Sequence, residues 1–301
     1  MRVTQFLKAS LFKFLGDNCP QQAAALAFYT FFSLPPLLFL LLTVVGLVLD
    51  PAVAAARIEA QFSGLVGQAG AEQISGMLEA VGEADTAGGL GAVLGVVLVL
   101  FGATAAFAQL QASLNRVFRV EPDPTRGDIG NFLLKRLLSF AMVLSVAFLL
   151  LVSLALSTLL AAFGDFLGQL LPGELSEPVL AALHLAVDFA AATVLFALMY
   201  RVLPDARFAW RDVTVGAVVT AVLFIAGKFA IGYYLGRSDP GTAYGAAGSL
   251  ALVMIWVYYS AMVLLGGAVL TYVWADQRGA GVRPEPGAVE VRIEKHRQPT
   301  S

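Results

Sequence analysis

Six long apolar segments, separated by connections rich in charge, Pro and Gly, constrain the fold of this chain more than any other feature. A helix that crosses a bilayer needs about 20 predominantly apolar residues, and each segment provides them. Only 13% of the 301 residues are charged, whereas soluble domains carry about 25%. The sequence therefore predicts an all-α, polytopic membrane protein with six transmembrane helices. The predicted spans are Gln22–Leu49, Leu90–Leu114, Leu137–Phe163, Val179–Val202, Asp212–Gly236 and Gly245–Trp274.

The distribution of Lys and Arg predicts the orientation of these spans. The connections are numbered from the N-terminus. Of the 19 basic residues, Arg57 and Arg237 lie in odd-numbered connections and Lys228 lies within a span. All the others lie in or beside the two terminal segments and the even-numbered connections. Cytoplasmic connections carry an excess of Lys and Arg, so both termini are predicted to be cytoplasmic.

The chain divides into three predicted parts. Residues 1–17 are expected to form an interfacial amphipathic helix, or alternatively the cytoplasmic end of the first span. Residues 18–275 form the transmembrane domain, including an outer loop at 50–89 with one or two short helices. Residues 276–301, rich in Pro and mixed charge, are expected to be a disordered cytoplasmic tail. The apolar stripe of the N-terminal helix is Val3, Leu7, Leu11 and Phe14.

The first span contains two adjacent prolines, Pro35 and Pro36. Each proline removes a backbone donor and crowds the preceding turn. The span is therefore predicted to be kinked or broken, and broken helices often build transport sites. A passive kink is the alternative. Three polar side chains before the prolines are candidates to line such a path: Tyr29, Thr30 and Ser33.

Charged side chains inside spans are the strongest candidates for a functional site, because they are costly in lipid. Lys228 lies in the fifth span and Asp188 in the fourth, with His184 four residues before Asp188. An antiparallel hairpin centred near Arg207 would bring Asp188 and Lys228 to a similar depth. One interpretation is a buried pair within a polar pathway, with His184 one turn nearer the outside. The alternatives are a purely structural ion pair, or two residues that face protein independently.

Two Gly-x-x-x-Gly pairs, Gly91 with Gly95 and Gly232 with Gly236, predict close approach of helices. The sequence offers no phosphate loop, no Gly-x-Ser-x-Gly elbow and, with Cys19 as its single cysteine, no cysteine-based metal site. Neither catalytic residues nor a cofactor nor a metal is therefore predicted, and the net charge of -2 gives no reason to expect a nucleic-acid partner.

Several short motifs, in order along residues 5–275, resemble the YihY/BrkB family of bacterial inner-membrane proteins. They are Asn18–Pro20 with Ala23–Pro35, Leu114–Phe118, Tyr200–Pro204 with Gly216 and Ala217, Tyr244–Ser249, and Ile255–Tyr259. The resemblance implies six spans and an inner-membrane location. One departure is Val269, which follows Gly267 and Ala268 where the family commonly has Glu.

Members of that family have been named as ribonuclease BN, as virulence factors and as exporters of lipid A precursors. The resemblance and the intramembrane charges together favour a transporter or flippase-like protein for an amphipathic envelope component, such as an anionic lipid. The alternative is a membrane scaffold or assembly factor without transport activity. A ribonuclease is not expected, because the residues offer no cleavage machinery. The sequence predicts neither the oligomeric state nor the substrate.

Overall fold

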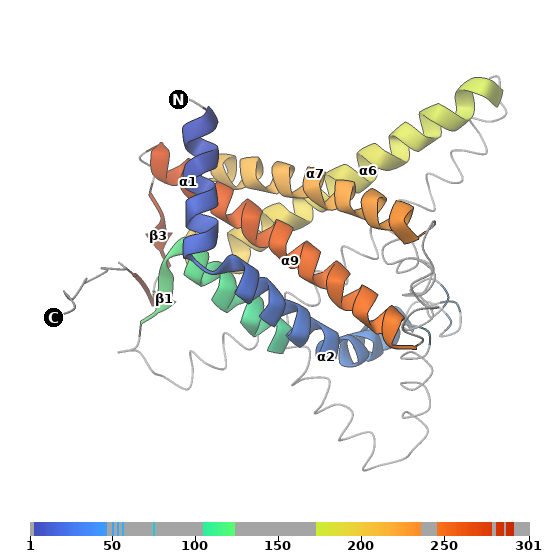
Figure 1. Ribbon diagram of the computed structural model, residues 1–301, viewed down its shortest axis with the longest axis horizontal. Helices are drawn as coiled ribbons and strands as arrows, with labels where there is room; N and C mark the ends of the chain where they lie inside the picture. The colour runs from blue at the N-terminus through green and yellow to red at the C-terminus, as the bar shows by residue number, and fades with distance from the viewer. Residues whose placement is uncertain are drawn as a thin grey trace, which may run out of the picture.

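The computed structural model describes residues 3–46, 105–123, 173–235, 246–278, 281–285 and 287–291, together with Asp50, Val53, Ala56 and Ser75. These residues form a bundle of long helices with short strands at one end (Figure 1). The helices are α1 (Val3–Gly16), α2 (Cys19–Gly46), a helical segment at 105–118, α6 (Gly173–Val202), α7 (Trp210–Leu235) and α9 (Ala246–Gln277). The strands are β1 (Val120–Pro122), β2 (Ala206–Arg207), β3 (Arg283–Pro284) and β4 (Ala288–Glu290).

The described long helices coincide with predicted spans. Within the described part of the chain, three stretches are long and apolar enough to cross a membrane, namely Ala181–Val202, Trp210–Ala230 and Val253–Gln277. They correspond to the fourth, fifth and sixth predicted spans. The second predicted span is described only from residue 105, and the third, Leu137–Phe163, lies outside the described residues, as does most of the 50–89 loop.

The N-terminal helix is separate from the first span. α1 ends at Gly16 and α2 begins at Cys19. Between them the chain turns at Asn18, whose φ of 55° places it in the left-handed region that Asn tolerates. Figure 1 shows the two helices running in different directions. α1 is therefore a helix of its own and does not continue the helix of the first span.

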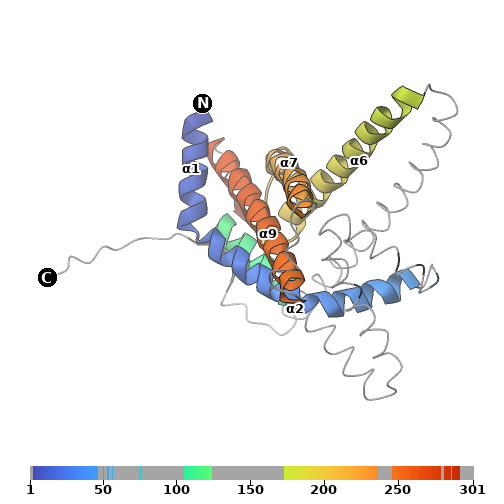
Figure 2. The same cartoon turned by 45° about the vertical axis from the view of Figure 1, so that its right-hand side comes forward.

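The first span bends but is not broken. α2 is one continuous helix across Pro35 and Pro36, and Figure 2 shows that its ribbon changes direction part of the way along. Prolines remove two backbone hydrogen bonds in this region, which explains a bend within an otherwise regular helix.

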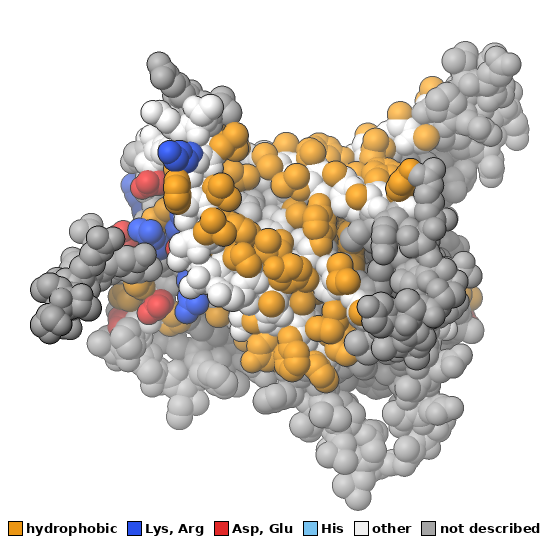
Figure 3. Space-filling model, viewed as in Figure 1, with side chains coloured by type: hydrophobic (Ala, Val, Ile, Leu, Met, Phe, Trp, Pro, Cys, Tyr) orange, Lys and Arg blue, Asp and Glu red, His pale blue; other side chains and the backbone are white. Residues whose placement is uncertain are grey.

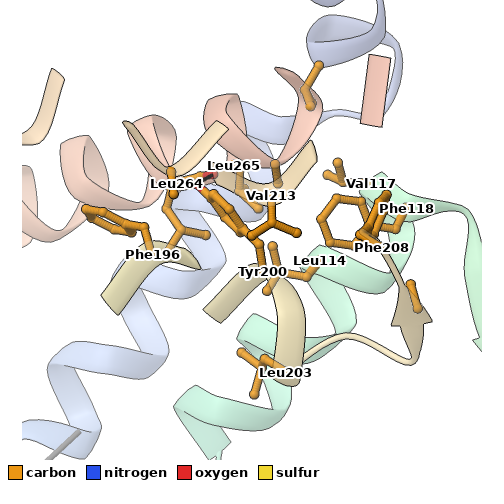
Figure 4. Packing of buried hydrophobic residues seen from close by; sticks show 14 of the residues in the cluster. Leu114, Val117, Phe118, Phe196, Tyr200, Leu203, Phe208, Val213, Leu264 and Leu265 are labelled. Atoms are coloured by element: carbon orange, nitrogen blue, oxygen red, sulfur yellow. Dashed lines mark hydrogen bonds between the residues drawn. The ribbon is translucent and has the colours of Figure 1, made fainter. Parts of the chain in front are cut away.

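The best-packed part of the molecule lies where 105–118, α6, α7 and α9 meet, next to the strands (Figure 4). Phe118 and Phe208 pack with ring centroids 4.6 Å apart. Phe118 is the last residue of the helical segment and Phe208 lies between β2 and α7, so the core extends into the connections. Its fully buried members include Leu114, Val117, Phe118, Tyr200, Val213 and Leu265.

The C-terminal segment differs from the predicted disordered tail. Within 281–291 the chain forms β3, which pairs antiparallel with β2, and β4, which pairs antiparallel with β1. Gly281 and Gly287 have φ of 60° and 95°, a conformation that glycine adopts without steric cost, and they allow the turns beside these strands. Backbone pairing with two loops distant in sequence provides the order that the composition of the tail does not predict.

Candidate functional site

Lys228 and Asp188 form an ion pair between two helices that are long and apolar enough to cross a membrane. Lys228 Nζ lies 3.2 Å from Asp188 Oδ2, joining α7 to α6. The hairpin between these helices turns at 203–209, so residues at similar distances from the turn face each other. The side chains remain 31% and 50% exposed, respectively. The two residues are therefore paired, and neither side chain is fully buried.

The other residues predicted for the pathway lie elsewhere. His184 belongs to α6, one turn from Asp188, and its side chain is outside the described part of the structure. Ser33 is buried and its hydroxyl donates to the Tyr29 carbonyl at 2.7 Å. Tyr29 itself is exposed and Thr30 is partly buried. These three residues lie on α2, which packs mainly on α9, so the structure does not join them to the charged pair.

A buried polar network links α6, α7 and α9 at the end of the bundle where the strands lie, here called the strand end. The Tyr200 hydroxyl donates to the Leu264 carbonyl at 2.7 Å and lies 2.8 Å from Thr220 Oγ1. Thr220 Oγ1 also donates to the Gly216 carbonyl. Figure 4 shows Tyr200 directed toward the Leu264 and Leu265 region of α9. Hydrogen bonds of this kind hold buried polar groups without an unpaired donor or acceptor.

Two glycines bring α7 and α9 into close contact. A methyl group on Gly216 would meet the Gly267 carbonyl oxygen at 2.6 Å and overlap the Thr271 hydroxyl. One on Gly267 would overlap the Thr220 and Tyr200 hydroxyls. The predicted packing glycines differ, since Gly232 lies further along α7, whereas Gly91, Gly95 and Gly236 are outside the described residues. The sequence does carry small residues four apart at this contact, Gly216 with Thr220 and Gly267 with Thr271, and this spacing favours close packing of helices.

Asp205 holds the connection between α6 and α7 against the helix at 105–118. Asn115 Nδ2 donates to Asp205 Oδ2 at 2.8 Å, and the Asp205 backbone N–H donates to Asn115 Oδ1 at 2.8 Å. Gln111 Nε2 adds a contact at 3.4 Å to Asp205 Oδ1. The segments Leu114–Phe118 and Tyr200–Pro204, which carried the family resemblance, thus meet at the strand end.

A second ion pair secures α1. Lys13 Nζ lies 2.7 Å from Asp17 Oδ2, and both side chains are over nine-tenths buried. Lys13 also lies over the ring of Tyr272 on α9, 3.9 Å from its centroid. Burial lowers the pKa of Lys13, while the hydrogen bond to Asp17 opposes that shift. The pair fixes the turn between α1 and α2 against α9.

Among the described residues, no group of three or more His, Cys, Asp and Glu side chains is placed to hold a metal ion. Val269, which replaces the Glu common in the family, is 1% exposed within the core. An apolar side chain suits that position, so this chain places no carboxylate there.

Comparison with known proteins agrees with this architecture. The chain is 31% identical to a UPF0761 membrane protein of Pseudomonas aeruginosa over 273 residues, which cover 88% of this chain and 62% of the relative. It is 28% identical to UPF0761 membrane proteins of Alkalilimnicola ehrlichii and Nitrosospira multiformis, with 94% and 96% of this chain covered. The chain thus spans somewhat less than two thirds of these relatives' length.

No solved structure matches the chain. The family model described as "Virulence factor BrkB" matches residues 11–291, which include the last part of α1, the whole of α2, α6, α7 and α9, and both strand pairs. Because that match covers nearly all of the described structure, the chain belongs to the BrkB family of membrane proteins.

Proposed function

We propose that this protein is a transporter or flippase-like protein for an amphipathic envelope component, such as an anionic lipid, in the bacterial inner membrane. The observation that carries the proposal is the Lys228–Asp188 pair, which lies on membrane-spanning helices yet keeps accessible surface on both side chains. A charge within a span is costly, and such residues commonly mark substrate pathways. In this role Lys228 attracts an anionic head group, and Asp188 neutralises Lys228 when the site is empty.

The packing of the strand end supports a path with one closed end. Tyr200, Thr220 and Asp205 are held by hydrogen bonds between helices and loops, and Leu265 fills the space around them. The charged pair lies along α6 and α7 away from this packed end. An arrangement with one firmly closed end and an accessible charged site suits alternating access, in which only one side is open at a time.

Lipid movement in vesicles tests this function. The purified protein is reconstituted into phosphatidylcholine vesicles that contain a trace of fluorescently labelled phosphatidylglycerol, and dithionite reports how much label reaches the outer leaflet. We expect fast movement with the wild type and a loss of at least tenfold in rate with Lys228→Leu. Labelled phosphatidylcholine should move more slowly than labelled phosphatidylglycerol, because Lys228 attracts net negative charge.

Two matched variants distinguish the effect of losing the Lys228 charge from the effect of misfolding. Lys228→Arg keeps the cation and should retain most of the activity, whereas Phe229→Ala changes a neighbouring side chain that is exposed on the same helix and should have little effect. Equal rates in wild type and Lys228→Leu would exclude a path through the charged pair. No movement with folded wild-type protein would contradict lipid transport of this probe.

A membrane scaffold is the second candidate, and one observation favours it. The strand pairs β1–β4 and β2–β3 bring two loops and the C-terminal segment together outside the spans, with Arg207 and Glu285 exposed. Such a surface is suited to docking a partner. A scaffold would tolerate Lys228→Leu in cells while losing function when the strands are removed. In either case we infer that the protein is not an enzyme, so purified protein should not cleave RNA.

A further inference from the structure

α1 has two apolar faces, and the helix bundle covers only one of them. Phe6, Ala9 and Phe14 pack on the core, and the Phe6 ring meets the Trp274 ring edge-on at 5.9 Å. The other face carries four large apolar side chains that are each more than half exposed. They are Leu7 at 56%, Leu11 at 59%, Phe12 at 65% and Leu15 at 56%.

This exposed face differs from the stripe that the sequence predicts. Of the predicted stripe, Leu7 and Leu11 point outward, whereas Phe14 packs on the bundle. Lys13, which is not part of that stripe, turns inward to Asp17. Lys8 is exposed among the apolar residues, with its Nζ 5.9 Å from the Phe12 ring centroid. A contiguous apolar surface of this kind is unusual unless something covers it.

The position of α1 indicates that lipid covers its exposed apolar face. Figure 1 shows α1 crossing the bundle near the strand end instead of running along the spans. In Figure 3 the described side chains of the bundle are mostly hydrophobic, and the charged ones gather beside α1 and the strands. α1 therefore lies where the apolar surface of the bundle gives way to charge, which is the position of a helix at a bilayer interface.

Basic side chains stacked on aromatic rings occur at the same end of other helices. The Arg278 guanidinium lies 4.3 Å from the Trp274 ring centroid, and that of Arg201 lies 5.0 Å from the ring of Trp210, which is 55% exposed. Trp side chains prefer the membrane interface, and adjacent Lys and Arg attract anionic head groups. Together with Lys8 these pairs supply positive charge on three separate parts of the strand end.

We propose that the exposed face of α1, defined by Leu7, Leu11, Phe12 and Leu15, inserts into the leaflet at the strand end, with Lys8 and the Arg–Trp pairs contacting anionic phospholipid head groups. The partner is an anionic lipid surface, which the apolar side chains enter at the level of the upper acyl chains. The inference is independent of transport, because it concerns only how α1 contacts the bilayer.

Site-specific quenching in the full-length protein tests the proposal. Leu11→Cys carries a fluorescent label, and the native Cys19 stays unlabelled because it is fully buried. The protein is reconstituted in vesicles of phosphatidylcholine with three-tenths phosphatidylglycerol. Labels at Phe229→Cys on α7 and at Arg207→Cys on β2 serve as lipid-facing and water-facing references. Quenching is measured with lipids spin-labelled near the head group and with aqueous iodide.

We expect the label at position 11 to be quenched by spin-labelled lipid at least half as strongly as at position 229. Its iodide quenching should be at least threefold weaker than at position 207. Spin-labelled phosphatidylglycerol should quench it more than spin-labelled phosphatidylcholine, and Lys8→Gln should reduce that difference. Quenching by iodide as strong as at position 207, without lipid quenching, would overturn the proposal. Protection from both quenchers would also overturn it, since another protein surface would then cover α1.

Discussion

Gly267 is a residue at which one added methyl group would disturb contacts between three helices. Its Cβ would collide with the Thr220 and Tyr200 hydroxyls, which themselves join α6 and α7 to α9. Overpacking a tight site typically costs about 1–3 kcal/mol, because neighbours must leave their preferred positions. We therefore expect Gly267→Ala to lower the melting temperature by several degrees in a detergent thermal-shift assay.

The neighbouring glycine provides a matched control. A methyl group on Gly266 would meet only the Phe14 ring, at an ordinary distance of 3.9 Å. Alanine also has a better helix propensity than glycine. Gly266→Ala should therefore leave the melting temperature unchanged or raise it slightly. Equal destabilisation by the two substitutions would show that the close contact at Gly267 does not determine the packing of α7 on α9.

Cys19 provides a pH-dependent test of the turn between α1 and α2. Burial, with a further contribution from the Asp17 carboxylate, raises the pKa of the thiol to about 12. The unfolded thiol ionises near its ordinary value of 9.0, so its contribution to stability is full below pH 9 and falls progressively as the pH rises toward 12.

Thiolate is the form that reacts with maleimide. At pH 8, Cys19 in folded protein should therefore react at least a hundredfold more slowly than a cysteine at position 207, and Cys19→Ala should abolish the small residual reaction. Rapid labelling of native Cys19 would mean that this turn opens readily.

At the scale of single elements, the strands of the C-terminal segment hold two loops together. The Glu285 N–H donates to the Asp205 carbonyl at 3.0 Å, the Asp123 N–H donates to the Gly287 carbonyl at 2.9 Å, and the Val291 N–H donates to the Arg119 carbonyl at 2.9 Å. Ending the chain after Arg278 removes all of these bonds. We expect amides of 119–123 and 205–207 to exchange hydrogen at least tenfold faster in that variant.

A chain that ends after Val291 is the control for this truncation. It retains β3 and β4 and lacks only 292–301, so its exchange in the two loops should match that of the full chain. If both truncations left the loops equally protected, the strands would contribute little to their stability, and the packing of Phe118 on Phe208 would be sufficient.

The sequence predicts long helices well and their contacts poorly. The predicted fifth span, Asp212–Gly236, differs from α7 by one or two residues at each end, because a long apolar run sets the limits of a helix in lipid. A nearly uniform apolar composition does not encode which face of α7 meets α9, so Gly216 and Gly267 were not identified as the contact. β3 and β4 are only two and three residues long, and they form by pairing with β2 and β1, which are distant in the sequence. No local sequence pattern therefore predicts them.

At the scale of the whole molecule, polarity separates the two ends of the described bundle. The strand end combines one buried ion pair, hydrogen bonds between its segments and strand pairing. The Lys228–Asp188 pair joins α6 to α7 away from that packed end. The described bundle therefore has a closely packed base at the strand end, from which α6 and α7 extend to the charged pair.

The distribution of Lys and Arg along the sequence also predicts which side of the membrane this base faces. Positive charge keeps short connections in the cytoplasm, so the strand end should be cytoplasmic. We expect fusions to green fluorescent protein to fluoresce, and fusions to alkaline phosphatase to be inactive, after Asp123, Arg207 and Val291. The reverse is expected after Ser75, Pro172 and Arg237.

These six positions test the number of spans as well as their direction. Each consecutive pair along the chain is separated by one predicted span, so every reporter should alternate. The same signal at Asp123 and Pro172 would remove the third span, Leu137–Phe163. A phosphatase signal at Arg207 would place the strand end on the periplasmic side of the membrane. That result would also move the lipid-facing surface of α1 to the outer leaflet, where Lys8, Arg201 and Arg278 would meet a different set of head groups.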